Sequence, residues 1–177
     1  MIVLFDMFGV IARDQSAEVM ASMSTSPSFW EAYWAHRPAY DRGDVTAEEY
    51  WAQVGHPPLV EKDVASWSRV DYKMVALLHE LHRAGRRIAL LSNIPEDHAR
   101  YFERTYAWLD LFEVRGFSCR IGAAKPEAAA FRWCRDALGG GEILFVDDRL
   151  ENVQAAERVG MRGHHFTSIE TLRSVLL

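Results

Sequence analysis

The chain has 177 residues, of which 49% are hydrophobic and 25% are charged, and its formal net charge is −5. This length and composition predict one substantial core with a small appendage, and they exclude an intrinsically disordered chain. The negative charge argues against nucleic acid as a partner, so we expect a phosphate ligand to be bound by a local site rather than by the overall field.

The cysteine content and the N-terminus indicate the compartment. Only Cys119 and Cys134 are present, which is too few for a disulfide framework and fits a reducing environment. The apolar start of the chain lacks a basic flank and is interrupted by Asp6, unlike a secretory signal or a membrane span. We therefore expect a soluble, cytoplasmic protein without a membrane partner.

Short apolar runs bounded by polar or turn residues predict the buried strands of a parallel sheet. The clear runs are residues 2–5, 88–91 and 143–146, and the weaker ones are residues 114–117 and 163–166. Apolar stripes with helical spacing lie between them, and Pro126 suits the first turn of one such helix. The alternation predicts a Rossmann-like α/β domain of three layers with a mostly parallel sheet, formed by residues 1–13 and 70–177.

Residues 14–69 interrupt this alternation. The segment contains no convincing strand and is dense in aromatic side chains. Thr46 followed by Glu49 is a capping-box pattern that predicts the start of a helix. We interpret the segment as a small helical cap, inserted after the first strand and standing over the carboxyl end of the sheet.

Polar residues follow the predicted strands at the edge where parallel α/β sheets bind ligands. They are Asp6 after the first strand, Ser92 and Asn93 after the second, Asp147 and Asp148 after the 143–146 strand, and Lys125 in between. Any one of these alone would be read as a turn or helix-cap residue. If they converge, repulsion between the carboxylates calls for a cation. Oxygen ligands without histidine or cysteine favour Mg²⁺ over zinc.

The same groups suit phosphoryl transfer. A carboxylate with an ordinary pKa of ~3.9 is ionised at neutral pH, so Asp6 needs no activating base to attack phosphorus. Mg²⁺ and Lys125 would neutralise the phosphoryl oxygens, while Ser92 and backbone N–H groups would donate hydrogen bonds. We predict a phosphatase for a small phosphorylated metabolite that passes through an aspartyl phosphate on Asp6.

At these residues the sequence resembles the haloacid dehalogenase superfamily, most of whose members are phosphatases. Residues 2–10 resemble its nucleophile motif, Leu90 to Asn93 its second motif, Lys125 to Glu127 its third, and Phe145 to Asn152 its fourth. The motifs occur in order and span nearly the whole chain outside the insertion. The insertion corresponds in position to the helical cap of the family, and it is similar to the caps of small sugar-phosphate phosphatases.

The resemblance implies a role for each matched residue. Asp6 would be nucleophile and metal ligand, with the Phe8 carbonyl and Asp148 as further Mg²⁺ ligands and Asp147 as an outer or alternative ligand. Ser92, Asn93 and Lys125 would hold the phosphoryl group. In the cap, we predict that His36, Arg37, Tyr40 and Asp41 determine specificity.

Phe8 departs from the family pattern. Typical phosphatases of the family carry an aspartate there, which protonates the leaving group and contributes roughly 10²–10⁴ in rate. Either the leaving group needs little help, as in a sugar 1-phosphate or an acyl phosphate, or another group such as Asp14 supplies the proton.

Two alternatives follow from the same departure. A 2-haloacid dehalogenase also has an aromatic residue at this position, but displacing a halide needs no Mg²⁺ and therefore does not explain Asp147 and Asp148. A catalytically silent binding member of the superfamily is the other alternative, although a binding protein has no use for the nucleophile Asp6.

Overall fold

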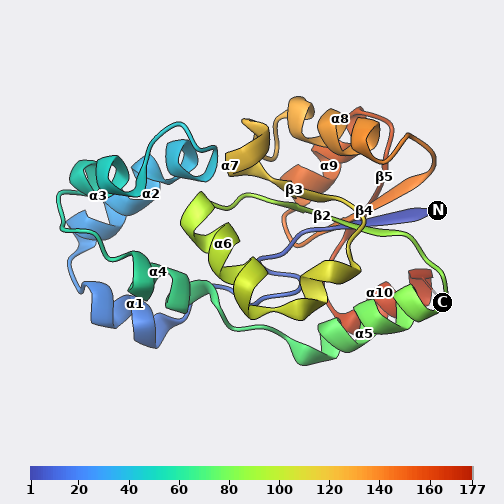
Figure 1. The fold of residues 1–177 in the computed structure, drawn as a ribbon, viewed down its shortest axis with the longest axis horizontal. Coiled ribbons are helices and arrows are strands. Elements are labelled where there is room, and N and C mark those ends of the chain that lie inside the picture. The colour runs from blue at the N-terminus through green and yellow to red at the C-terminus, as the bar shows by residue number, and fades with distance from the viewer. Residues whose placement is uncertain (177) are drawn as a thin grey trace.

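The computed structural model describes residues 1–176, and its centre is a five-stranded, fully parallel sheet in the order β3-β2-β1-β4-β5. The strands are β1 (Ile2–Phe5), β2 (Ile88–Ser92), β3 (Arg115–Phe117), β4 (Ile143–Asp147) and β5 (Arg162–His165). Helices cover both faces of the sheet, so the three-layer α/β prediction is confirmed (Figure 1). All of the predicted strands form, with small shifts at their ends.

The central strand supplies side chains to both layers because successive residues of a strand point to opposite faces. Val3 and Phe5 join the core beneath α5 (Tyr72–Arg83), α6 (Glu96–Thr105), η1 (Ala107–Leu111) and α10 (Ile169–Leu176). Ile2 and Leu4 join the core beneath α8 (Ala128–Ala137) and α9 (Leu150–Arg158), next to the short α7 (Ser118–Ile121). A strand buried on both faces explains the continuous apolar run.

One helix begins later than expected. α8 starts at Ala128 with Glu127 as its N-cap, so Pro126 lies outside the helix, in the segment that carries Lys125. The Lys125–Pro126 peptide bond is cis. Pro126 therefore belongs to the loop that lies over the sheet edge.

The inserted segment folds into α1 (Ala17–Met23), α2 (Pro27–Asp41), α3 (Ala47–Val54) and α4 (Val60–Trp67), which we call the cap. The cap lies at the end of the molecule away from both chain termini (Figure 1). It has an aromatic core of its own, with Phe29, Tyr33, Tyr40, Tyr50 and Trp51 at its centre. Thr46 and Glu49 form the predicted capping box at the start of α3. The division at residues 14–69 stays a prediction, which this separate core supports.

Buried charges tie the cap together and to the sheet domain. Asp63, fully buried on α4, lies 3.1 Å from Nη1 of Arg37 and accepts a 2.6 Å hydrogen bond from the Tyr33 hydroxyl. The Nε2 atom of His98, on α6, lies 3.3 Å from Asp63 Oδ2. Burial opposes the ionisation of Asp63, but Arg37, His98 and the Tyr33 hydrogen bond together outweigh it and lower the pKa of Asp63 to about 2. The cap therefore depends on an ionised carboxylate inside it.

Within residues 1–176, no helix combines the length and the apolar composition that crossing a membrane requires.

We predict that Asp63→Asn destabilises the protein by about 3–5 kcal/mol, because it leaves the buried guanidinium of Arg37 with one carboxylate fewer. Since the folded-state pKa of Asp63 lies below its unfolded value, its contribution is complete above about pH 4 and is lost as the pH falls toward about 2. Urea unfolding at pH 7 and pH 3 measures this. The matched control is Glu61→Gln, an exposed site on the same helix. Equal stability of the two variants would contradict the prediction.

Candidate active site

The sheet register brings the predicted acidic residues together. β1 lies between β2 and β4, and Phe5 pairs with Val146, so Asp6 and Asp147 are neighbours at the carboxyl edge. Here the connection after β1 leads to β2 on one side and the connection after β4 leads to β5 on the other, and such a switch point is the usual ligand site of open α/β sheets. Oxygen atoms of Asp6, Asp147 and Asp148 lie within 4.8 Å of one another.

Lys125 is the cation at the centre of this group. Its Nζ lies 2.6 Å from Asp6 Oδ1 and 2.7 Å from Asp147 Oδ2, and the residue is only 6% exposed. Burial alone would lower the pKa of Lys125, but the two carboxylates outweigh it and raise the pKa. Lys125 is therefore an ammonium ion across the working pH range of the site.

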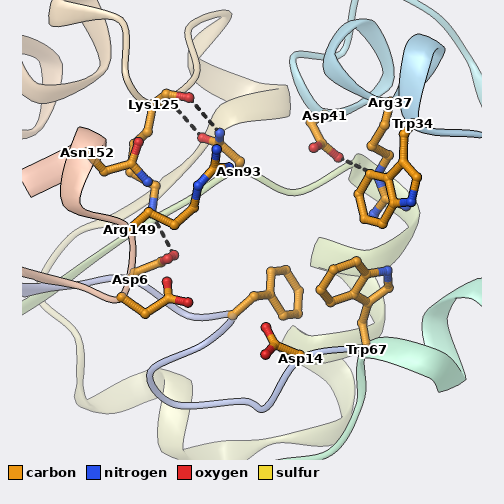
Figure 2. A pocket seen from close by; sticks show the side chains of 12 residues that line it. Asp6, Asp14, Trp34, Arg37, Asp41, Trp67, Asn93, Lys125, Arg149 and Asn152 are labelled. Carbon is orange, nitrogen blue, oxygen red and sulfur yellow. Dashed lines mark hydrogen bonds and ion pairs between the residues drawn. The ribbon is translucent and has the colours of Figure 1, made fainter. Parts of the chain in front are cut away.

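The Lys125 segment is held in place by Asn93. The Asn93 side-chain amide donates a 2.8 Å hydrogen bond to the Lys125 carbonyl, and its oxygen accepts one of 2.8 Å from the Lys125 amide (Figure 2). Asn93 also lines the cavity described below. Its polar atoms are engaged with the backbone, so positioning of Lys125 is its visible contribution, and phosphate contact stays a prediction.

The carboxylate of Asp147 already has a full set of partners. In addition to Lys125, it accepts hydrogen bonds from the Arg149 amide at 2.8 Å and from Asn152 Nδ2 at 3.1 Å to each oxygen. It is completely buried. These contacts favour a supporting role behind the metal site and leave Asp6 and Asp148 as the carboxylates with free coordination capacity.

The donor set fits a hard divalent cation. Carboxylate oxygens are the ligands that Mg²⁺ prefers. Gly9 has no side chain and so leaves room for the Asp148 carboxylate, because a Cβ on Gly9 would lie 2.3 Å from Asp148 Oδ2. Burial, opposed by Lys125 and reinforced by Asp147 and Asp148, raises the pKa of Asp6 to about 8. Burial and the charges of Asp147 and Asp14 likewise raise the pKa of Asp148. The protein alone thus leaves an excess of negative charge at this point.

Ser92 ends β2 as predicted. Its residue is fully buried, and its hydroxyl has no hydrogen-bond partner among the described residues. An unsatisfied buried hydroxyl is costly, so a ligand oxygen that accepted a hydrogen bond from it would be favoured. The phosphate-binding role of Ser92 stays a prediction that this hydroxyl supports.

A cavity of about 270 Å³ opens above these groups, between the sheet edge and the cap (Figure 2). The lining residues are Asp6, Phe8, Asp14, Trp34, Arg37, Asp41, Trp67, Asn93, Lys125, Asp148, Arg149 and Asn152. Of the predicted specificity residues, Arg37 and Asp41 line it. The other two do not: His36 is half-buried elsewhere on α2, and Tyr40 packs in the cap core with its hydroxyl donating to Asp97 at 2.9 Å.

The reason for this split is the helical repeat. Arg37 and Asp41 are four residues apart and share a face of α2, where Arg37 Nε donates a 2.7 Å hydrogen bond to Asp41 Oδ1. His36 and Tyr40, which each precede one member of this pair by one residue, point elsewhere. Trp34, one turn earlier, could have been found by the same spacing. Arg149 carries no such signal, because it reaches the cavity from the loop after β4.

Comparison with known proteins agrees with this arrangement. Residues 1–160 match the family model described as haloacid dehalogenase-like hydrolase. The chain belongs to this family of hydrolases. Its predicted membership is confirmed.

Relatives of this hydrolase include phosphatases. The sesquiterpene phosphatase astK of Aspergillus oryzae is 32% identical over 139 residues, which cover 72% of this chain and 70% of the relative. A phosphoglycolate phosphatase of Cereibacter sphaeroides is 36% identical over 108 residues, covering 60% of this chain and only 49% of that enzyme. A haloacid dehalogenase family enzyme of Bacteroides thetaiotaomicron, solved with magnesium and inorganic phosphate, shares the fold with a TM-score of 0.77. That likeness has 19% identity and covers 97% of this chain and 98% of the other.

We predict that the metal-free hydrolase loses stability between about pH 4 and pH 8 and that Asp6→Asn loses less. The pKa of Asp6 is raised to about 8 in the folded state, so the unfolded chain releases this proton first and stability falls as the pH rises through the window. Thermal unfolding in EDTA measures the effect, with a difference of several degrees expected. Identical pH profiles of the two proteins would contradict the prediction.

Proposed function

We propose that this hydrolase is a Mg²⁺-dependent phosphatase that acts through an aspartyl phosphate on Asp6. The observation that carries the proposal is the Lys125 ammonium, bound between Asp6 and Asp147 and beside Asp148. Asp6, Asp148 and the backbone carbonyl of Phe8 would hold the ion, with Asp147 behind them. When bound, Mg²⁺ would supply positive charge against the phosphoryl oxygens.

The residues of the chain account for both halves of the reaction. A carboxylate oxygen of Asp6 forms a bond to phosphorus while the bond from phosphorus to the ester oxygen breaks. Lys125 and the Ser92 hydroxyl hold phosphoryl oxygens, and Asn93 fixes the Lys125 segment. Water then hydrolyses the aspartyl phosphate, which returns the carboxylate of Asp6 and releases inorganic phosphate.

The leaving oxygen needs a proton, and Phe8 cannot supply one. The cavity lining contains Asp14, which lies near Trp67 and outside the group that surrounds Lys125 (Figure 2). We therefore propose Asp14 as proton donor, in preference to a leaving group that departs unaided. Its backbone carbonyl accepts a 2.6 Å hydrogen bond from Arg69, which fixes the loop that carries it.

Two observations favour this function over a dehalogenase or a silent binding protein. Displacement of a halide does not require the two further carboxylates near Asp6, those of Asp147 and Asp148, whereas a cation-dependent phosphatase requires them. Phosphatases are among the relatives with at least 30% identity. They include a sesquiterpene phosphatase and a phosphoglycolate phosphatase, so the relatives leave the substrate class open.

The direct test is hydrolysis of acetyl phosphate and aryl phosphates with and without Mg²⁺. We expect EDTA to abolish turnover and Mg²⁺ to restore it, and we expect Asp6→Asn and Asp148→Asn to lower kcat by about 10³-fold or more because nucleophile or ion is lost. Asp136→Asn, exposed on α8, is the control. Halide release that resists EDTA would favour the dehalogenase instead.

A second test addresses the proton donor. Asp14→Asn should lower kcat about 10²-fold or more for alkyl phosphates, whose alcohols need a proton, and much less for 4-nitrophenyl phosphate. A Brønsted plot of rate against leaving-group pKa should be steeper for the variant than for the wild type. Parallel plots would exclude Asp14 from this role.

A further inference from the structure

Three aromatic residues of the cavity lining, Phe8, Trp34 and Trp67, form an aromatic wall. Trp34 and Trp67 lie on the side of the cavity away from Lys125 (Figure 2). The rings of Phe8 and Trp67 have their centroids 5.1 Å apart, and those of Trp34 and Trp67 are 6.1 Å apart. Phe8 also packs edge-on against Phe102 at 5.6 Å, which fixes the ring from behind. The wall therefore extends without interruption from the residue beside the nucleophile to the cap.

The polar edge of Trp67 is turned away from the cavity. Its indole N–H donates a 3.2 Å hydrogen bond to the hydroxyl of Tyr33, inside the buried network of the cap. A buried or half-buried indole usually places its N–H on such a partner, and the rest of the ring is then available as apolar surface. At Trp67, the wall therefore presents apolar carbon surface to the leaving group of a substrate.

The cations near the wall are already neutralised. Arg37 is 5% exposed and is bound at once by Asp41, at 2.7 Å, and by Asp63, at 3.1 Å. Arg149 pairs with Glu151, but more weakly, because both side chains are more than half exposed. A leaving group with a carboxylate or second phosphate would have to displace one of these partners or face unpaired carboxylates, which costs free energy.

From the wall and the neutralised cations, we propose that the substrate is the phosphate monoester of an uncharged, apolar alcohol, aryl or unsaturated, whose carbon skeleton packs against Phe8, Trp34 and Trp67. This inference rests on the proposed phosphatase function and specifies its substrate class. The phosphoryl group lies at Lys125 and the apolar group points toward the cap, so that burying it adds binding energy at the side where Phe8 replaces a carboxyl group.

A set of aryl esters tests the proposal. Phenyl, 2-naphthyl and 4-carboxyphenyl phosphate have leaving groups of comparable acidity and differ in apolar area and in charge. We expect kcat/KM for the 2-naphthyl ester to exceed that for the phenyl ester about tenfold, since a second ring buries additional apolar surface. The 4-carboxyphenyl ester should be poorer than the phenyl ester.

Tryptophan variants connect the preference to the wall. Trp34→Ala should reduce the 2-naphthyl to phenyl ratio of kcat/KM to about 3 or less, and Trp34→Phe should retain most of it. Trp133→Ala is the matched control, because Trp133 is 41% exposed on α8 compared with 47% for Trp34 and does not line the cavity. It should leave the ratio unchanged. Far-UV circular dichroism verifies that the variants fold.

Acetyl phosphate separates failure of this inference from failure of the phosphatase proposal, because its leaving group is small and already activated. Mg²⁺-dependent hydrolysis of acetyl phosphate with no preference for the 2-naphthyl ester, or with a preference for the 4-carboxyphenyl ester, would overturn the apolar substrate class alone. Failure to hydrolyse acetyl phosphate and all aryl esters would overturn the phosphatase proposal and this inference with it.

Discussion

The site depends on one interaction, the buried contact of the Lys125 ammonium with the carboxylates of Asp6 and Asp147. Removing these charges from water is expensive, and only close pairing with further hydrogen bonds offsets the loss. The surrounding residues supply those bonds. Asn93 holds the backbone of Lys125, and Asn152 donates to both oxygens of Asp147. Much of the carboxyl edge of the sheet is organised around this ammonium group.

The pairing leaves the negative charge only partly compensated. Even beside Lys125, the pKa of Asp6 is raised to about 8 by burial and by its acidic neighbours. The proposed role of Asp6 as nucleophile requires it to be ionised, so the chain by itself holds Asp6 in an unfavourable state for that role at neutral pH. A divalent cation would complete the balance of charge. In this arrangement, binding of the ion and ionisation of the nucleophile are the same thermodynamic event.

The cap uses charge in a different way. Its arginine, Arg37, is bound by Asp41 and Asp63, so the charge stabilises the cap and is not offered to a ligand. Because the charge of Arg37 is paired within the cap, aromatic rings are the remaining recognition surface on the cap side of the cavity. Stability of the cap and the proposed selectivity for apolar groups thus have a common origin. The close approach of Gly43 to the Cys119 carbonyl, where a Cβ would lie 2.5 Å away, shows how tightly the end of α2 fits the sheet domain.

The sequence by itself determined the strands, the three-layer fold and the residues at the strand ends, because these follow from local apolar runs and from the rule that parallel strands end at one edge. It predicted the arrangement of Asp6, Asp147, Asp148 and Lys125 for that reason. Only the tertiary structure decided that Asp147 is saturated, that Tyr40 turns into the cap core and that Arg37 is neutralised by Asp63 from another helix. Those facts depend on packing between segments distant in the chain, and no local pattern encodes which partners two helices bring together.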